Sequence, residues 1–158
     1  MIRLLKLTLP MLLYSVPISL ILSIILVKLK KTDFLHGLFY FYIINVIYIC
    51  FFARHTSYRR IDLMPFQTLQ ASMNNIVYYL ENIIMFAPLG VFLILLKQYS
   101  FKKSLLICFV TSLSIEVLQY IFALGLSQTD DVIANTLGGL VGIVLAMGIK
   151  RFRYRRND

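Results

Sequence analysis

Residues 132–149 read VIANTLGGLVGIVLAMGI, a run of 18 residues that contains no charged side chain. An apolar run of about this length is typical of a helix that crosses a lipid bilayer. Small residues recur at every fourth position, at Ala134, Gly138, Gly142 and Ala146, and such a row lets a second helix approach closely. The run therefore predicts a membrane-spanning helix that packs tightly against another helix.

Four further apolar runs of similar length precede it in the 158-residue chain: Leu7–Val27, Phe34–Ala53, Ile76–Leu96 and Ser104–Leu124. The composition agrees, since 59% of residues are hydrophobic, 15% are charged and the mean hydropathy is +0.81. So few charges cannot cover a small soluble domain, which excludes an ordinary soluble enzyme, a disordered tail and a disulfide-rich secreted module. We expect an all-α polytopic membrane bundle of about five helices, forming a single domain over residues 1–158.

The first run has an alternative interpretation as a cleaved signal peptide, with Arg3 and Lys6 as its basic start. It is long for that role and lacks the small residues of a cleavage site, so a retained helix is favoured. The connection 54–75 mixes apolar and polar residues around Pro65, and we expect it to lie at the outer membrane interface between the second and third spans.

Basic residues predict the orientation of the bundle, because cytoplasmic loops of membrane proteins are rich in Lys and Arg. With five spans, eleven basic residues fall on the side of the C-terminus: Lys28, Lys30, Lys31, Lys97, Lys102, Lys103, Lys150, Arg151, Arg153, Arg155 and Arg156. Only five fall on the other side. We therefore expect a cell-membrane protein whose N-terminus is outside and whose C-terminus is cytoplasmic. The basic tail 150–158 is interpreted as a topology anchor and not as a nucleic-acid site.

Acidic residues at membrane depth are costly and usually functional. In the expected topology Glu116 lies in the outer half of the fourth span, and Gln119 shares its helical face. Asp131 and Asn135, four residues apart, share a face of the fifth span. We expect one outward-facing polar pocket that collects Glu81, Asn82, Glu116, Gln119, Asp130, Asp131 and Asn135 and is closed by Arg59, Arg60 and Asp62.

Structural alternatives remain for several of these residues. Asp130 is placed to cap the fifth span, and Asn82, Gln119 and Asn135 are suited to hydrogen bonds between helices. No metal or cofactor is expected from the spacing of the His, Cys, Asp and Glu residues.

Three blocks of the chain resemble the VanZ-like family of small membrane proteins. They are 60–66 (RIDLMPF), 81–90 (ENIIMFAPLG) and the pair 116–119 (EVLQ) with 130–139 (DDVIANTLGG). Together they cover about residues 59–145 and leave 1–53 less constrained. Asp62 stands where the family usually has Asn.

The resemblance implies low-level resistance to teicoplanin, a glycopeptide that carries an acyl chain. One hypothesis is a non-catalytic envelope protein whose pocket binds the drug or a lipid-linked cell-wall precursor, with membrane lipids as its surroundings. The alternative is an intramembrane enzyme for a lipid-linked or amphiphilic substrate, with Glu116 as acid or base and Asp131 as its helper. A transporter, and a polar cluster that only holds the helices together, also stay open.

Overall fold

The computed structural model describes residues 33–53, 58–66 and 73–155, together with isolated positions between 17 and 29. The chain divides into two compact units, Met1–His55 and Thr56–Asp158. Each unit is described by itself. The predicted first span, Leu7–Val27, falls mostly outside the described residues and stays a prediction.

In the first unit, helix α2 (Phe34–Ile47) continues into the π-helical turn η1 (Tyr48–Phe52). Together they are long and apolar enough to cross a membrane, as predicted for the second span. Asp33 caps the start of α2, because its carboxylate accepts the amide of His36 over 3.2 Å. The side-chain hydrogen bond with the His36 ring, aided by this amide bond, holds the pKa of Asp33 below its ordinary value.

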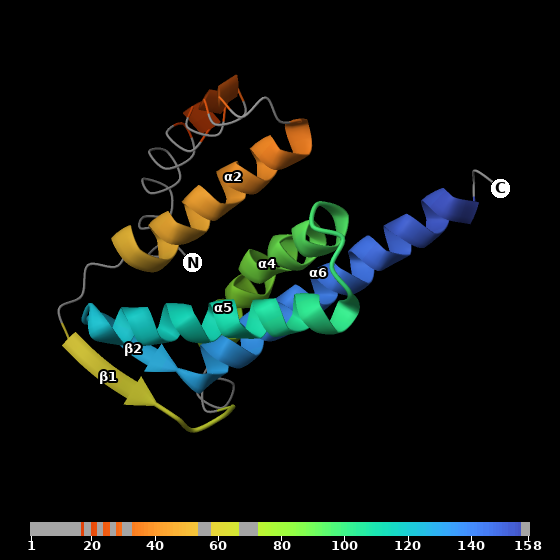
Figure 1. Cartoon of the computed structure of the whole chain (residues 1–158). Coiled ribbons are helices and arrows are strands. Elements are labelled where there is room, and N and C mark those ends of the chain that lie inside the picture. The colour runs from red at the N-terminus through yellow and green to blue at the C-terminus, as the bar shows by residue number, and fades with distance from the viewer. Residues whose placement is uncertain are drawn as a thin grey trace. The chain divides into compact units, whose positions relative to one another are not determined.

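The second unit is built on three long helices, α4 (Met73–Leu95), α5 (Phe101–Ile121) and α6 (Thr129–Arg155) (Figure 1). All three contain segments long and apolar enough to cross a membrane, which gives four such helices among the described residues. The predicted third, fourth and fifth spans are therefore found, while the total of about five is not established. Helix α5 ends three residues earlier than predicted, because the chain turns at Ala123, whose φ is 56°.

Helices α4 and α6 approach each other backbone to backbone. A Cβ atom added at Gly138 would lie 2.2 Å from the carbonyl oxygen of Ile83, and one at Gly142 would lie 1.9 Å from that of Ala87. Both alanines of the small-residue row are fully buried. The row on α6 therefore does what the sequence predicted, since only the absence of side chains there lets the two helices meet.

Helix α5 packs on the other side of α6. The Sγ atom of Cys108 lies 2.5 Å from the position of a Cβ atom at Gly139, so the thiol fills the space that this glycine leaves. Both Cys108 and Cys50 are buried free thiols. Phe86 and Ile143 are fully buried and complete the core.

Two short strands form a parallel ribbon that the all-α prediction did not include. Strand β1 (Tyr58–Asp62) pairs with β2 (Leu124–Gln128), in a register that sets Arg60 opposite Leu126. A parallel pair needs a long crossover, and α4 and α5 supply it. The ribbon lies at the end of α5 and the start of α6 (Figure 1). The connection 54–75, for which no strand was predicted, thus contains one.

Candidate functional site

The predicted polar residues gather mainly at one end of the second unit, where α5 ends and α6 begins. The connectivity requires this arrangement, since consecutive long helices run in opposite directions. The opposite end of these helices carries Lys97, Lys102, Lys103 and Lys150. The second unit therefore has a polar, acid-bearing end with the ribbon, and a basic end.

Glu116 connects α5 to the ribbon. Its side chain is buried, with 6% exposure, and Oε2 accepts the backbone amide of Gln128 over 2.9 Å. The carbonyl oxygen of the same residue accepts the Ser127 hydroxyl over 3.0 Å. The amide of Gln128 thus stabilises the buried carboxylate, and Ser127 ties the backbone of the same residue to β2.

Two side-chain hydrogen bonds link the helices at this end. Asn82 of α4 donates its Nδ2 to Oδ1 of Asp131 on α6 over 2.8 Å. Asn135 of α6 donates its Nδ2 to the Ser112 hydroxyl of α5 over 2.9 Å. Both asparagines therefore make the helix-to-helix bonds that the sequence allowed as their structural alternative.

Asp130 is buried in the first turn of α6, one residue inside the helix and not before it. Its Oδ1 accepts the backbone amide of Phe66 over 2.5 Å. Phe66 has a positive φ of 63°, so the chain turns sharply at this contact. Asp130 thus fastens the segment that follows β1 to the start of α6, which differs from the N-cap that the sequence suggested.

Gln119 completes the buried polar face of α5. Ser112, Glu116 and Gln119 follow each other at helical spacing, and all three are buried. The Oδ1 atom of Asn135 faces no hydrogen-bond partner among the described residues. The polar side chains of this face find partners on β2 and α6, as Gln128 and Asn135 show.

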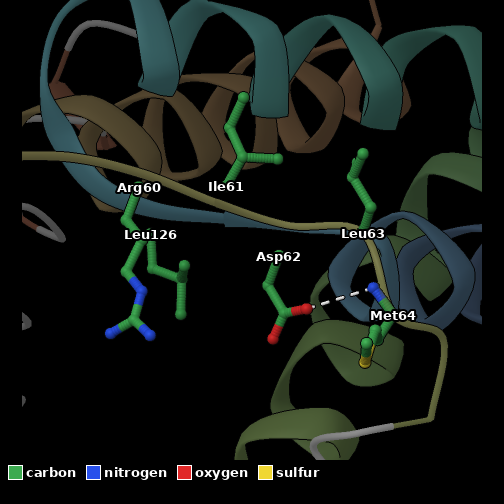
Figure 2. Close-up of a pocket in the computed structure, with 6 residues that line it drawn as sticks. All are labelled: Arg60, Ile61, Asp62, Leu63, Met64 and Leu126. Atoms are coloured by element: carbon green, nitrogen blue, oxygen red, sulfur yellow. Dashed lines mark hydrogen bonds between the residues drawn. The ribbon is translucent and has the colours of Figure 1, made fainter.

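Three predicted residues lie elsewhere. Glu81 is exposed on α4 and makes no hydrogen bond or ion pair with the described part of the chain. Arg60 and Asp62 lie on the face of the ribbon that points away from α5, whereas Ile61 lies on the other face and points toward α5 (Figure 2). They therefore line a separate open hollow instead of closing a pocket over Glu116.

This ribbon hollow has a volume of about 710 Å³ and is lined by Arg60, Ile61, Asp62, Leu63, Met64 and Leu126 (Figure 2). The Oδ1 atom of Asp62 accepts the Met64 amide over 3.0 Å, which fixes the turn at its rim. Within residues 33–53, 58–66 and 73–155, no three His, Cys, Asp or Glu side chains are grouped as metal ligands.

Arg59, which was expected to help close the pocket, contacts α5 instead. Its Nη2 donates to the carbonyl oxygen of Ile121 over 3.0 Å. That carbonyl belongs to the last turn of α5, where helices leave acceptors without intrahelical partners. Sequence reasoning gave no role to Ser127 and Gln128 of β2. The alternation of Leu124 and Leu126 with other residues was the available signal, but five residues are too few to make it convincing, and the buried positions are Gly125 and Ser127.

Comparison with known proteins covers most of this region. The sequence profile of the VanZ/LLP1 family matches residues 39–151, which extends the similarity back into α2. Protein VanZ of Enterococcus faecium is 30% identical over 118 residues, covering 69% of this chain and 71% of that protein. No solved structure matches. The matched range contains every residue of the polar end described above.

Proposed function

Because the chain belongs to the VanZ/LLP1 family of membrane proteins, we propose that it lowers the susceptibility of the cell envelope to teicoplanin-type lipoglycopeptides. The similarity to Protein VanZ, which covers 69% of this chain, is the observation that carries this proposal. The protein acts from within the cell membrane, with its polar end facing outward.

The distribution of charge supports this orientation. Lys97, Lys102, Lys103 and Lys150 lie at the end of the second unit opposite the ribbon. Cytoplasmic ends of membrane proteins are rich in Lys and Arg, so the basic end belongs inside. The polar end then faces outward, where a glycopeptide that acts on the cell wall arrives.

The hydrogen bonds of the acids support a non-catalytic role. Glu116 accepts an amide of β2, Asp130 accepts the amide of Phe66, and Asp131 accepts Asn82. Each of these carboxylates already accepts a hydrogen bond from the protein itself, which favours a role in holding the fold together over a role in proton transfer. The hydrogen bonds of the polar end then have a structural role, which is to hold the ribbon in a fixed position at the membrane surface.

Drug susceptibility in a sensitive Gram-positive host tests the proposal. Cells with empty vector, the wild-type chain, Asp130→Ala or Lys102→Gln are compared at equal membrane levels against teicoplanin and vancomycin. We expect selective protection against teicoplanin, reduced in Asp130→Ala because the segment after β1 is released. Lys102→Gln, an exposed change at the basic end, keeps full protection. Equal protection against both drugs contradicts the proposal.

Recovery of the drug and lipids after exposure tests the mechanism. Unmodified teicoplanin and unmodified lipids are expected. A covalently modified drug or lipid supports instead the intramembrane enzyme, for which the burial of Glu116 is the favouring observation. In that case Glu116→Gln at equal membrane levels abolishes the modification.

A further inference from the structure

The ribbon sets two opposite charges side by side on its outer face. Alternate residues of a strand point to opposite faces, so Arg60 and Asp62 share one face and Ile61 lies on the other (Figure 2). The parallel register adds Leu126 next to Arg60 as the apolar floor between the strands. The hollow thus offers a cation, a carboxylate and an apolar contact on one surface.

Arg60 and Asp62 share this face without forming an ion pair with each other. They are two residues apart on an extended strand, a separation of about 6.5 to 7 Å between their Cα atoms. Arg60 is exposed and makes no hydrogen bond or ion pair with the described part of the chain. The turn to Met64 fixes the position of Asp62. A ligand that carries an anion and a cation a short distance apart complements this pair.

The rim of the hollow indicates where that ligand is found. Leu63 is 75% exposed, Met64 is 69% exposed, and Phe66 is half exposed close behind them. Tyr58, with both an apolar ring and a hydroxyl, is exposed at the start of the same strand. Such a mixture is typical of a segment at the interface between lipid headgroups and acyl chains. The hollow therefore lies at headgroup depth.

We propose that the ribbon hollow binds the headgroup of an amine-bearing phospholipid. Arg60 hydrogen-bonds the phosphate, Asp62 accepts a hydrogen bond from the ammonium group, and Met64, on the same side as Asp62, contacts the first acyl carbons (Figure 2). Arginine is well suited to phosphate because its planar guanidinium donates two parallel hydrogen bonds.

This proposal does not depend on drug protection. It concerns the outer face of the ribbon, whereas the proposed function rests on similarity to Protein VanZ. Loss of lipid binding with intact protection, or the reverse, therefore separates the two.

The test measures binding of fluorescent phosphatidylethanolamine, phosphatidylglycerol and phosphatidylcholine to the purified full chain in detergent micelles. The first carries a primary ammonium, the second carries no cation, and the third carries a methylated cation without N–H donors. We expect phosphatidylethanolamine to bind about tenfold more tightly than either of the others, which corresponds to one charge-assisted hydrogen bond.

Two variants separate the roles of the two charges. Asp62→Asn keeps an oxygen for the Met64 amide but removes the negative charge, so it abolishes the preference for the amine and leaves phosphatidylglycerol binding unchanged. Arg60→Gln weakens binding of all three lipids about tenfold. Lys102→Gln, the matched loss of a cation at the basic end, leaves all three affinities unchanged.

Thermal unfolding serves as the folding control. An unfolding temperature equal to that of the wild type shows that a variant is still folded. The proposal is overturned if phosphatidylglycerol binds as tightly as phosphatidylethanolamine, or if Arg60→Gln binds all lipids like the wild type.

Discussion

The backbone amide of Gln128 on β2 donates to Oε2 of Glu116 on α5 over 2.9 Å. The Glu116 side chain, within a membrane-spanning helix, thus binds strand β2, which begins shortly after the same helix ends. The carbonyl oxygen of Glu116 takes the Ser127 hydroxyl as well. This one residue therefore sets where β2, and through it the ribbon, stands relative to the bundle.

Replacing Glu116 by leucine is expected to loosen the ribbon. The amide of Gln128 would lose its acceptor, which costs about 1 to 3 kcal/mol when the donor is buried. Glu116→Gln retains an oxygen at nearly the same place and should cost less. Unfolding in mixed detergents gives the free energies, and hydrogen exchange at 124–128 reports the loosening. If the leucine variant were as stable as the wild type, Glu116 would have no structural role in holding the ribbon.

The carboxyl group of Asp33 at the start of α2 should titrate below its ordinary value of 3.8. The side-chain hydrogen bond with the His36 ring is the largest cause, followed by the amide bond of the same residue. A lowered pKa means that the ionised cap stabilises α2 at any pH above the ordinary value, and that this contribution is lost as the pH falls through the folded pKa.

Carbon NMR of a chain labelled at aspartate carboxyls measures this pKa. In His36→Ala the value should rise toward the ordinary one, because the ring hydrogen bond is gone. Asp33→Asn keeps a capping oxygen, so α2 should begin at the same residue while its acid sensitivity disappears. A pKa that does not change in His36→Ala would assign the shift to another group.

The helices of the described chain were predictable because hydrophobicity and length are properties of single segments. That another helix approaches α6 closely was predictable for the same reason, since Gly138 and Gly142 stand at fixed spacing within one helix; that this helix is α4 comes from the structure. The polar end was predictable only as a set of residues. Which of them meet depends on segments as far apart in sequence as Phe66 and Asp130, and no local pattern encodes such a contact.

The ribbon escaped prediction for a related reason. Strand β1 pairs with a strand 66 positions further along, and each strand has only five residues. Their alternation decides which charges face the bundle. Arg59 reaches α5 and Arg60 does not, although the two are neighbours in sequence and identical in chemistry. The pairing register, and not residue type, therefore determines which arginine is available to a ligand.

The bond between Asn82 and Asp131 should couple α4 and α6 energetically. A double-mutant cycle with Asn82→Ala and Asp131→Ala is expected to give a coupling energy of about 0.6 to 2 kcal/mol, the range found for hydrogen bonds between membrane helices. The same cycle with Glu81→Ala in place of Asn82→Ala should give none, because Glu81 is exposed on the same helix. Equal coupling in the two cycles would mean that the effect arises from charge alone.

Adding a single methyl group to the α4–α6 contact should be more damaging than deleting a polar side chain at the site. In Gly142→Ala the new Cβ would lie 1.9 Å from the carbonyl oxygen of Ala87, and in Gly138→Ala it would lie 2.2 Å from that of Ile83. Both obstacles are backbone atoms of a packed helix, so the helices must separate. Overpacking of this kind costs about 1 to 3 kcal/mol or more.

Gly148→Ala supplies the matched control on the same helix. A Cβ atom there meets nothing within 4 Å, and alanine favours the helix over glycine by about 1 kcal/mol. We therefore expect this variant to be as stable as the wild type or more stable, while Gly138→Ala and Gly142→Ala unfold at lower detergent stress. If all three variants behaved alike, helix propensity and not the approach of α4 would govern this part of α6.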